Sequence, residues 1–237
     1  IRKGRSMETR AELKKAAKEC LNTNIFSYIG LLITGIVLPY AMTICLATLF
    51  IRLTLGNLFG LSVHYYAVNF LAIGTFAVLF YLISMFMLYW LVAYSIYVYA
   101  NDGERVSIFY VLNDHFTLKR YLRFCLKMVA SHILIFFWSL LLVIPGIIKA
   151  FSYSQVAFLA IDDEKAGVFE TIIKSKEMMR GYKMYYFILQ LSFILWTLLE
   201  PFTLGLISFY LVPYITLTNV AFYFDLKESL EEIEYDL

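Results

Sequence analysis

Residues 66–100 read YAVNFLAIGTFAVLFYLISMFMLYWLVAYSIYVYA and contain no Asp, Glu, Lys or Arg. A bilayer core is about 30 Å thick, and roughly 20 apolar helical residues cross it. Further apolar runs lie on both sides of this stretch. Over the whole chain 61% of residues are hydrophobic and 16% are charged, against roughly 45–50% and 25% in soluble domains. The sequence therefore predicts an all-α polytopic membrane protein.

Short polar connectors divide the apolar sequence into about six transmembrane runs. The runs are about 25–50, 66–100, 124–144, 147–161, 184–199 and 203–224. Pro39 predicts a kink in the first run. We expect the long second run to tilt strongly or to place its Tyr-rich end in the membrane interface. The fourth run is short for a full span, and a re-entrant segment is its alternative.

The connectors themselves predict turns and amphipathic helices. Arg52, Gly56, Gly60 and His64 predict a loop between the first two runs, and Pro145-Gly146 predicts a tight turn after the third. Residues 9–21, 107–116 and 162–183 repeat apolar side chains at helical spacing beside charged ones. This pattern is typical of interfacial helices on an anionic membrane surface. An amphipathic segment followed by two spans thus occurs three times, from residues near 9, 106 and 166.

Basic residues predict the orientation. All Lys and Arg except Arg52 and Lys149 fall in the N-terminal arm, in connectors 101–127 and 161–183, or in the tail. Six spans place those four segments on one side of the membrane. Positively charged loops face the cytoplasm. We therefore expect a multi-pass protein of a bacterial cytoplasmic membrane with both termini in the cytoplasm.

The chain divides into a single membrane domain at residues 7–225 and an acidic cytoplasmic tail at 226–237. Residues 1–6 precede Met7, and we interpret them as added residues or upstream read-through. In the tail, Leu226, Leu230, Ile233 and Leu237 recur at steps of four, three and four. This spacing is compatible with a helix that has one apolar edge.

Ionisable residues within or near spans are functional candidates by default, because they are costly there. Four residues qualify: Lys127, His132, Lys149 and Glu200. Lys127 is near enough to the inner surface for its chain to snorkel, whereas Lys149 and Glu200 lie near the predicted outer boundary. His132 is the deepest and could relay a proton. A structural role is favoured for all four.

Other patterns in the sequence argue against catalytic activity and metal binding. Asp162-Asp163-Glu164 could suggest a divalent-metal site, but adjacent acids on a connector more often end a span. The three cysteines have neither metal-ligand nor redox spacing. No Walker loop, His-Glu-x-x-His pattern, nucleophile elbow or carboxylate pair occurs in a span. We therefore expect no enzyme activity, no cofactor and no metal, and the charge distribution gives no support for nucleic-acid binding.

A collinear series of short motifs over about residues 107–225 resembles a known family. Its residues include Pro145, Gly146, Ser152, Tyr153, Ser175, Met179, Gly181, Trp196, Pro213, Tyr214, Phe222 and Tyr223. The series resembles the bacterial integral-membrane family called domain of unknown function 975, distantly similar to the membrane domain of glycerophosphodiester phosphodiesterases. The resemblance implies a multi-pass membrane protein with no established activity, and this chain lacks the phosphodiesterase domain. Structural roles account for the motif residues.

Three functions are compatible with this sequence. The first is a non-enzymatic module that organises membrane lipids or a protein partner through its cytoplasmic helices or acidic tail. A small transporter or channel is the second, because kinked helices near the midplane form transporter binding sites. An immunity or resistance factor against membrane-active peptides is the third.

Overall fold

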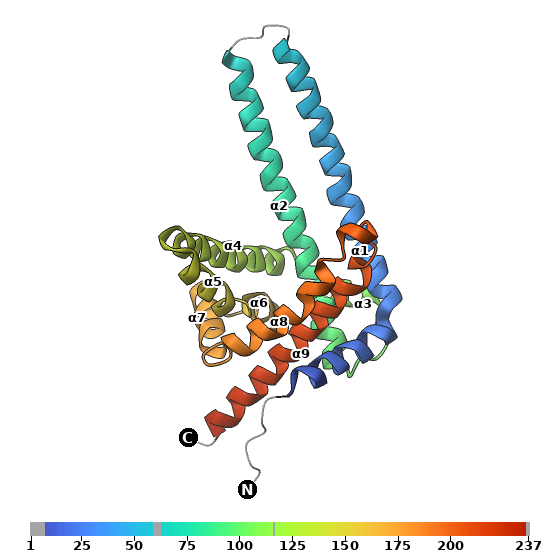
Figure 1. Ribbon diagram of the computed structural model, residues 1–237, viewed down its shortest axis with the longest axis vertical. Helices are drawn as coiled ribbons and strands as arrows, with labels where there is room; N and C mark the ends of the chain where they lie inside the picture. Colours follow the sequence, from blue (N-terminus) through green and yellow to red (C-terminus); the bar gives the residue numbers. More distant parts are fainter. Residues whose placement is uncertain (1–7, 59–62, 116, 236–237) are drawn as a thin grey trace. The chain divides into compact units, whose positions relative to one another are not determined.

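The computed structural model describes residues 8–58, 63–115 and 117–235, and all regular structure there is helical (Figure 1). This confirms the all-α prediction. The helices are α1 (Arg10–Leu58), α2 (Val63–Ala100), α3 (Ile108–His115), α4 (Leu118–Leu141), α5 (Val143–Ser152), α6 (Val156–Asp162), α7 (Val168–Met178), α8 (Lys183–Thr197), the short 3-10 helix η1 (Pro201–Thr203) and α9 (Ser208–Tyr235).

Four described segments are long and apolar enough to cross a membrane. They are Ile73–Ala100, Leu118–Leu141, Val143–Asp162 and Lys183–Thr203. They correspond to the predicted second to fifth runs. The predicted first and sixth runs coincide with parts of α1 and α9.

The chain forms two compact units. The main unit comprises Ile1–Ile29 and Tyr89–Leu237, and the second unit is Gly30–Leu88. The second unit consists of the later part of α1 and the earlier part of α2. The predicted loop at Arg52, Gly56 and His64 is wrong, because all three residues are helical. Gly60, and the side chain of Pro39 with its predicted kink, lie outside the described residues.

Helix α1 begins with a capping box. The backbone N–H of Thr9 donates to Glu12 Oε2 at 2.7 Å, and the N–H of Glu12 donates to Thr9 Oγ1 at 3.4 Å. The helix then continues where a boundary between an interfacial helix and a span was predicted. Leu13, Ala17 and Leu21 are fully buried. The apolar face of 9–21 therefore packs against protein, and it is not the surface that could contact lipid.

The turn between α4 and α5 lies at Leu142, three residues before the predicted position. Leu142 has extended dihedral angles and separates the two helices. Pro145 lies in the first turn of α5, where a missing N–H costs no helical hydrogen bond. A Cβ added to Gly146 would lie 2.8 Å from Ser139 Cα. Gly146 therefore permits close packing of the hairpin instead of forming its turn.

The predicted fourth run is two helices. α5 and α6 are separated by a turn at residues 153–155, and together they form the candidate span Val143–Asp162. The interfacial helix predicted within 162–183 corresponds to α7. At its start, Gly167 N–H donates a hydrogen bond of 3.0 Å to Glu170 Oε2. Gly181 has φ +89°, a backbone conformation that favours glycine, in the turn before α8.

Helix α9 is the most enclosed long helix of the main unit. Leu217, Val220, Phe222, Tyr223 and Leu226 are all fully buried. The helix runs to Tyr235 without a break at the predicted start of the tail. Leu226, the first residue of the predicted acidic tail, therefore belongs to the core.

Two of the three predicted repeats share the order of a short helix followed by two longer helical segments. They are α3, α4 and α5–α6, and then α7, α8 and α9. In the first repeat the amphipathic segment and the span are both part of α1. The predicted order of elements therefore holds for the second and third repeats. It is wrong for the first repeat, which has no separate amphipathic helix.

Candidate functional site

Several motif residues meet where α7 packs on the break between α5 and α6. Ser175 Oγ donates to the carbonyl of Ser152 at 3.0 Å. Gln155 is fully buried, and its Nε2 lies 3.0 Å from Ser154 Oγ and 3.5 Å from Met179 Sδ. The hydroxyl of Ser175 thereby satisfies a carbonyl next to the break in helical structure. The geometry gives these motif residues a structural role.

The acidic connector after α6 joins three helices. Asp162 Oδ2 accepts hydrogen bonds of 2.6 Å from Tyr223 OH and from Lys227 Nζ, both on α9. Asp163 Oδ2 lies 3.7 Å from Lys174 Nζ on α7. Each carboxylate is thus directed to a different partner, and the described residues contain no cluster of acids, His or Cys suited to a metal ion.

Glu164 and Lys127 complete this connector from α4. Glu164 Oε2 lies 2.7 Å from Arg120 Nε. Lys127 is only 1% exposed, and its Nζ donates to the backbone carbonyl of Asp163 at 2.9 Å. Lys127 therefore does not snorkel to the surface as predicted. Its ammonium group fastens α4 to the connector, which is a structural role.

The other three candidates occupy separate places. His132 Nδ1 lies 2.7 Å from the carbonyl of Met128 on its own helix. Lys149 Nζ lies 4.3 Å from the ring centroid of Trp138. It is also within electrostatic range of Lys176 and Lys183, although it was predicted on the opposite membrane side from them.

Glu200 lies in the predicted connection between α8 and α9. Its carbonyl accepts hydrogen bonds from Thr203 N–H at 3.2 Å and Gly205 N–H at 2.9 Å. Leu204 and Gly205, with φ of 51° and 79°, complete the reversal of the chain. The backbone of Glu200 thus contributes to a tight turn.

Motif aromatics pack on both sides of α9. Phe222 stacks on Tyr186 at 5.2 Å and Tyr223 on Phe158 at 5.7 Å. Tyr214 meets Phe193 edge to face at 5.5 Å. Trp196, in contrast, is more than half exposed. A ligand cage is not needed to explain the first three motif aromatics, because they fill the core.

Sequence reasoning missed Asn24, a buried polar residue with several hydrogen-bond partners. Its Nδ2 lies 3.0–3.2 Å from the carbonyls of Cys20, Gly103 and Glu104. Its Oδ1 accepts hydrogen bonds of 3.3 Å from Val106 N–H and Tyr94 OH. Only 3% of Asn24 is exposed. The residue joins α1, the end of α2 and the loop after it.

The first residues of the described chain meet α8 and α9. Glu8 N–H donates to Asp225 Oδ2 at 3.1 Å, and Tyr185 OH donates to the carbonyl of Glu8 at 2.7 Å. Lys14 Nζ lies 4.3 Å from the ring centroid of buried Phe193. Burial, with a smaller contribution from Arg10, lowers the pKa of Lys14. The N-terminal arm is therefore part of the packed main unit.

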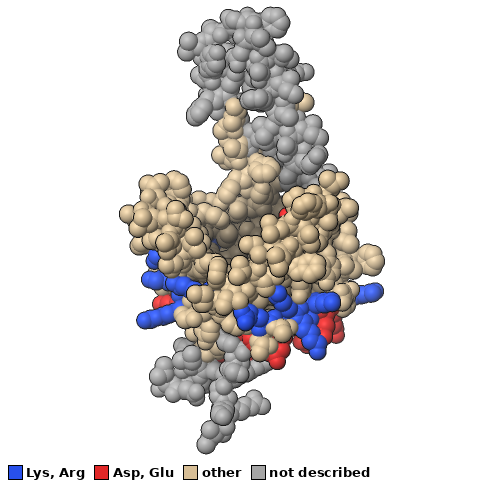
Figure 2. Space-filling view, viewed as in Figure 1, with Lys and Arg blue, Asp and Glu red and all other residues tan. Residues whose placement is uncertain are grey.

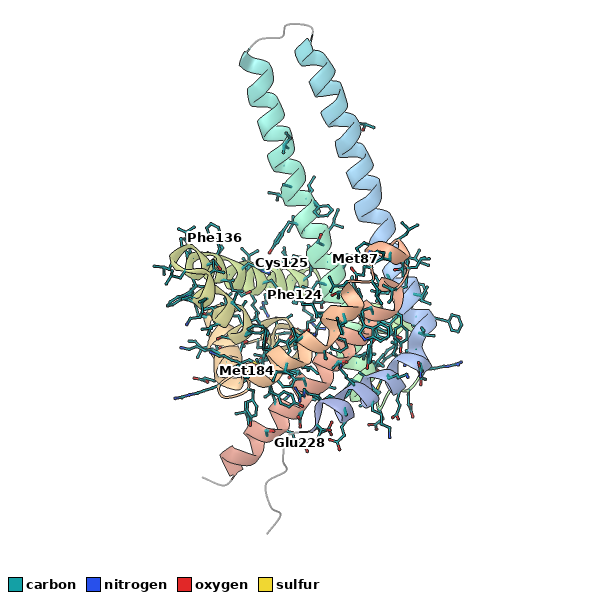
Figure 3. The ribbon with its side chains drawn as sticks, in the orientation of Figure 1. Met87, Phe124, Cys125, Phe136, Met184 and Glu228 are labelled. Carbon is teal, nitrogen blue, oxygen red and sulfur yellow. The ribbon has the colours of Figure 1, made fainter. Side chains whose placement is uncertain are left out.

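On the face drawn in Figure 2, most charged side chains of the main unit gather in one belt. Lys and Arg lie side by side in this belt, with acidic residues among them and at its lower edge, and almost all of the described surface above the belt is uncharged. Exposed apolar side chains such as Phe136, Leu140 and Ile144 surround the α4–α5 turn. Figure 3 shows Phe136 at that outer end, whereas Phe124 and Cys125 lie toward the interior. The surface thus divides into a charged belt and an apolar region.

Comparison with protein families gives a match over most of the chain. The model of the family described as "Protein of unknown function (DUF975)" matches residues 7–229. No curated protein and no solved structure matches this chain.

Proposed function

Because the chain belongs to the DUF975 family, whose function is unknown, we propose a function from its structure: a non-enzymatic module that organises lipids or a partner protein at a bacterial cytoplasmic membrane. The observation that carries the proposal is the belt of Lys and Arg beside exposed apolar surface. Such a belt suits the level of anionic headgroups. Apolar residues beside it suit the hydrocarbon core.

Contacts within the main unit support six spans. Asn24 before the apolar part of α1 bonds Gly103 and Glu104 after α2. Residues that bond one another lie on the same side of the membrane, so the chain between Asn24 and Gly103 crosses it an even number of times. If α2 crosses, α1 therefore crosses as well. Asp162 likewise bonds Tyr223 on α9, so α9 returns across the membrane that α8 has crossed. The four apolar candidate spans together with α1 and α9 make the six.

The same reasoning supports a common side for both termini. Glu8 N–H bonds Asp225 at 3.1 Å, which brings the two ends of the membrane domain together. Since the basic residues accumulate on this side, the positive-inside rule assigns it to the cytoplasm. In this arrangement α3 and α7 are interfacial. Exposed Phe109 on α3 and Phe169 on α7 suit a membrane surface.

Transport is a weaker candidate, because internal contacts account for most of the buried polar side chains; Gln155 Oε1, which has no hydrogen-bond partner among the described residues, is an exception. Lys127 bonds the Asp163 carbonyl, Ser175 bonds Ser152, and Gln190 Nε2 lies 2.5 Å from Asn219 Oδ1. Groups that serve a translocated substrate need exchangeable partners. No observation specifically favours the immunity function.

Topology is testable with single cysteines in a Cys20→Ser, Cys45→Ser, Cys125→Ser background. Cysteine at Lys165 or Lys15 should react with a membrane-impermeant maleimide only after the cells are opened, and cysteine at Phe202 should react in intact cells. Labelling of the position-165 variant in intact cells would refute the orientation.

Partner organisation is testable by crosslinking in native membranes, comparing the full chain with a version that ends at Ser229. That version keeps Asp225 and Lys227, and unchanged crosslinks would exclude a role for residues 230–237.

A further inference from the structure

An open pocket lies in the charged belt between α7 and α8. It has a volume of about 460 Å³ and is lined by Ile173, Lys176, Glu177, Arg180 and Lys183. Three cations thus face one carboxylate in a small space. Lys149 on α5 interacts electrostatically with Lys176 and Lys183 but does not line the pocket. The local charge is strongly positive.

These pocket cations are not neutralised by the protein. Lys176, Arg180 and Lys183 form no ion pair with a carboxylate among the residues that the structure describes. Elsewhere in the belt, Arg120 and Lys227 do have carboxylate partners. Neighbouring cations that repel one another are best stabilised by an anion. A bound anion would offset this positive charge.

The surroundings of the pocket restrict the kind of anion. On α7, Phe169 is 72% exposed and Ile173 is 54% exposed. On α8, Met184 follows Lys183 directly and is 67% exposed, and exposed Phe187 and Leu191 continue along the helix. Figure 3 labels Met184 near the start of α8. An anion with attached hydrocarbon chains fits both the charge and this apolar border.

We propose that this pocket binds the phosphodiester group of an anionic phospholipid, with the acyl chains along the exposed apolar surface of α8. Arg180 can bind two phosphate oxygens through its planar guanidinium group. Lys176 and Lys183 supply compact point charges. Glu177 opposes the anion and keeps binding reversible. The inference rests on the proposed membrane function, because it requires the α7–α8 turn at the headgroup level.

The test uses the full chain in nanodiscs and measures the affinity for fluorescent phosphatidylglycerol. The variant carries Lys176→Gln, Arg180→Gln and Lys183→Gln. Its matched control carries Lys15→Gln, Lys18→Gln and Lys119→Gln, which removes the same charge from exposed positions. Each cation near an anionic surface contributes roughly fivefold to affinity, so the pocket variant should bind about 100-fold more weakly. The control should change far less.

Glu177→Gln provides a test in the opposite direction. Removing the carboxylate should strengthen binding by roughly fivefold, a result that unfolding cannot produce. Equal losses in the pocket and control variants would overturn the site, and so would equal affinity for zwitterionic phosphatidylcholine. Competition by millimolar glycerol phosphate with the same potency as the lipid would assign the pocket to a free phosphate ester and overturn the lipid proposal.

Failure of the inference can be separated from failure of the proposed function. Maleimide labelling of the cysteine at position 165 reports which side the α6–α7 connector occupies, independently of lipid binding. Cytoplasmic labelling with no lipid preference would reject this pocket alone. Labelling from outside would reject the membrane orientation on which both proposals rest.

Discussion

Replacing Asn24 with alanine tests whether this residue holds α1, α2 and the 103–106 loop together. Alanine removes hydrogen bonds to the carbonyls of Gly103 and Glu104 and from Val106 N–H and Tyr94 OH. Tyr94 OH retains a second partner, the carbonyl of Val106, at 3.1 Å. The two loop carbonyls and the Val106 N–H therefore bear most of the loss.

The size of the effect follows from those three groups. A hydrogen bond contributes about 1 kcal/mol net, and an unsatisfied buried group costs about 1–3 kcal/mol. The loop can admit water to part of the gap, so we expect Asn24→Ala to lower the free energy of unfolding by about 3 kcal/mol. This loss reduces the ratio of folded to unfolded protein by about 10²-fold. Asn24→Asp should be no better, because a carboxylate would face three carbonyls.

The assay is equilibrium unfolding of the purified chain in mixed micelles, followed by far-UV circular dichroism. Asn101→Ala is the matched control, since Asn101 is exposed and its Nδ2 bonds one carbonyl, that of Tyr97, at 2.7 Å. Exposed substitutions usually change stability by less than about 0.5 kcal/mol. The reasoning fails if the two alanine variants unfold at the same denaturant activity.

Three further predictions concern packing, the connector and the cysteines. Gly146→Ala should lower stability by about 1–3 kcal/mol through overpacking against Ser139. Gly167→Ala has room for the new methyl group, with the nearest atom 3.7 Å away, and should cost only the poorer N-cap preference of alanine, less than about 1 kcal/mol in the same assay. Asp162→Asn should lower stability by about 1–2 kcal/mol, because a charge-assisted hydrogen bond to Lys227 is weakened. Lys227→Gln should cause a similar loss, and the double variant should lose less than the sum of the two single variants. Additive losses in the double variant would contradict this pairing. In a Cys45→Ala background, iodoacetamide should modify Cys20 slowly at pH 8, because burial and the nearby Glu19 raise the pKa of its thiol and reduce the thiolate fraction; modification as rapid as in unfolded protein would contradict this.

Hydropathy predicted most helices correctly, but it predicted a boundary between an interfacial helix and a span where α1 is continuous. Asn22-Thr23-Asn24 has the composition of a boundary, since such side chains compete for backbone hydrogen bonds. In the structure, Thr23 Oγ1 bonds the carbonyl of Glu19, and Asn24 Nδ2 bonds that of Cys20. Both bonds are to carbonyls four residues earlier, and they leave the helix intact. Only the tertiary contacts of Asn24, about 80 residues away in sequence, reveal its role.

The sequence identified the acidic connector at residues 162–164 but not the residues that it contacts. Asp162 is the last residue of the candidate span Val143–Asp162, where the sequence predicted that the acids end a span. The connector's partners could not be identified, because Lys127 and Lys227 are separated from it by 36 and 65 residues. The α7–α8 pocket was missed for a related reason. Lys183 follows the turn at Gly181, and this turn brings it beside Lys176 and Arg180 around one pocket.

Helix α9 is a proposed span but not one of the four apolar candidate segments, because polar residues lie along it. α9 carries Thr216, Thr218 and Asn219, which lower its apolar character, yet it is the most enclosed long helix. Thr216 and Thr218 each bond a carbonyl four residues earlier, and Asn219 bonds Gln190 on α8. A helix surrounded by protein needs little lipid-facing apolar surface, because its polar groups are satisfied internally. Composition therefore identifies helices that face lipid more readily than a helix enclosed by protein. The proposed side for the C-terminal half of α9 rests on the bonds that Tyr223 and Asp225 make to Asp162 and Glu8.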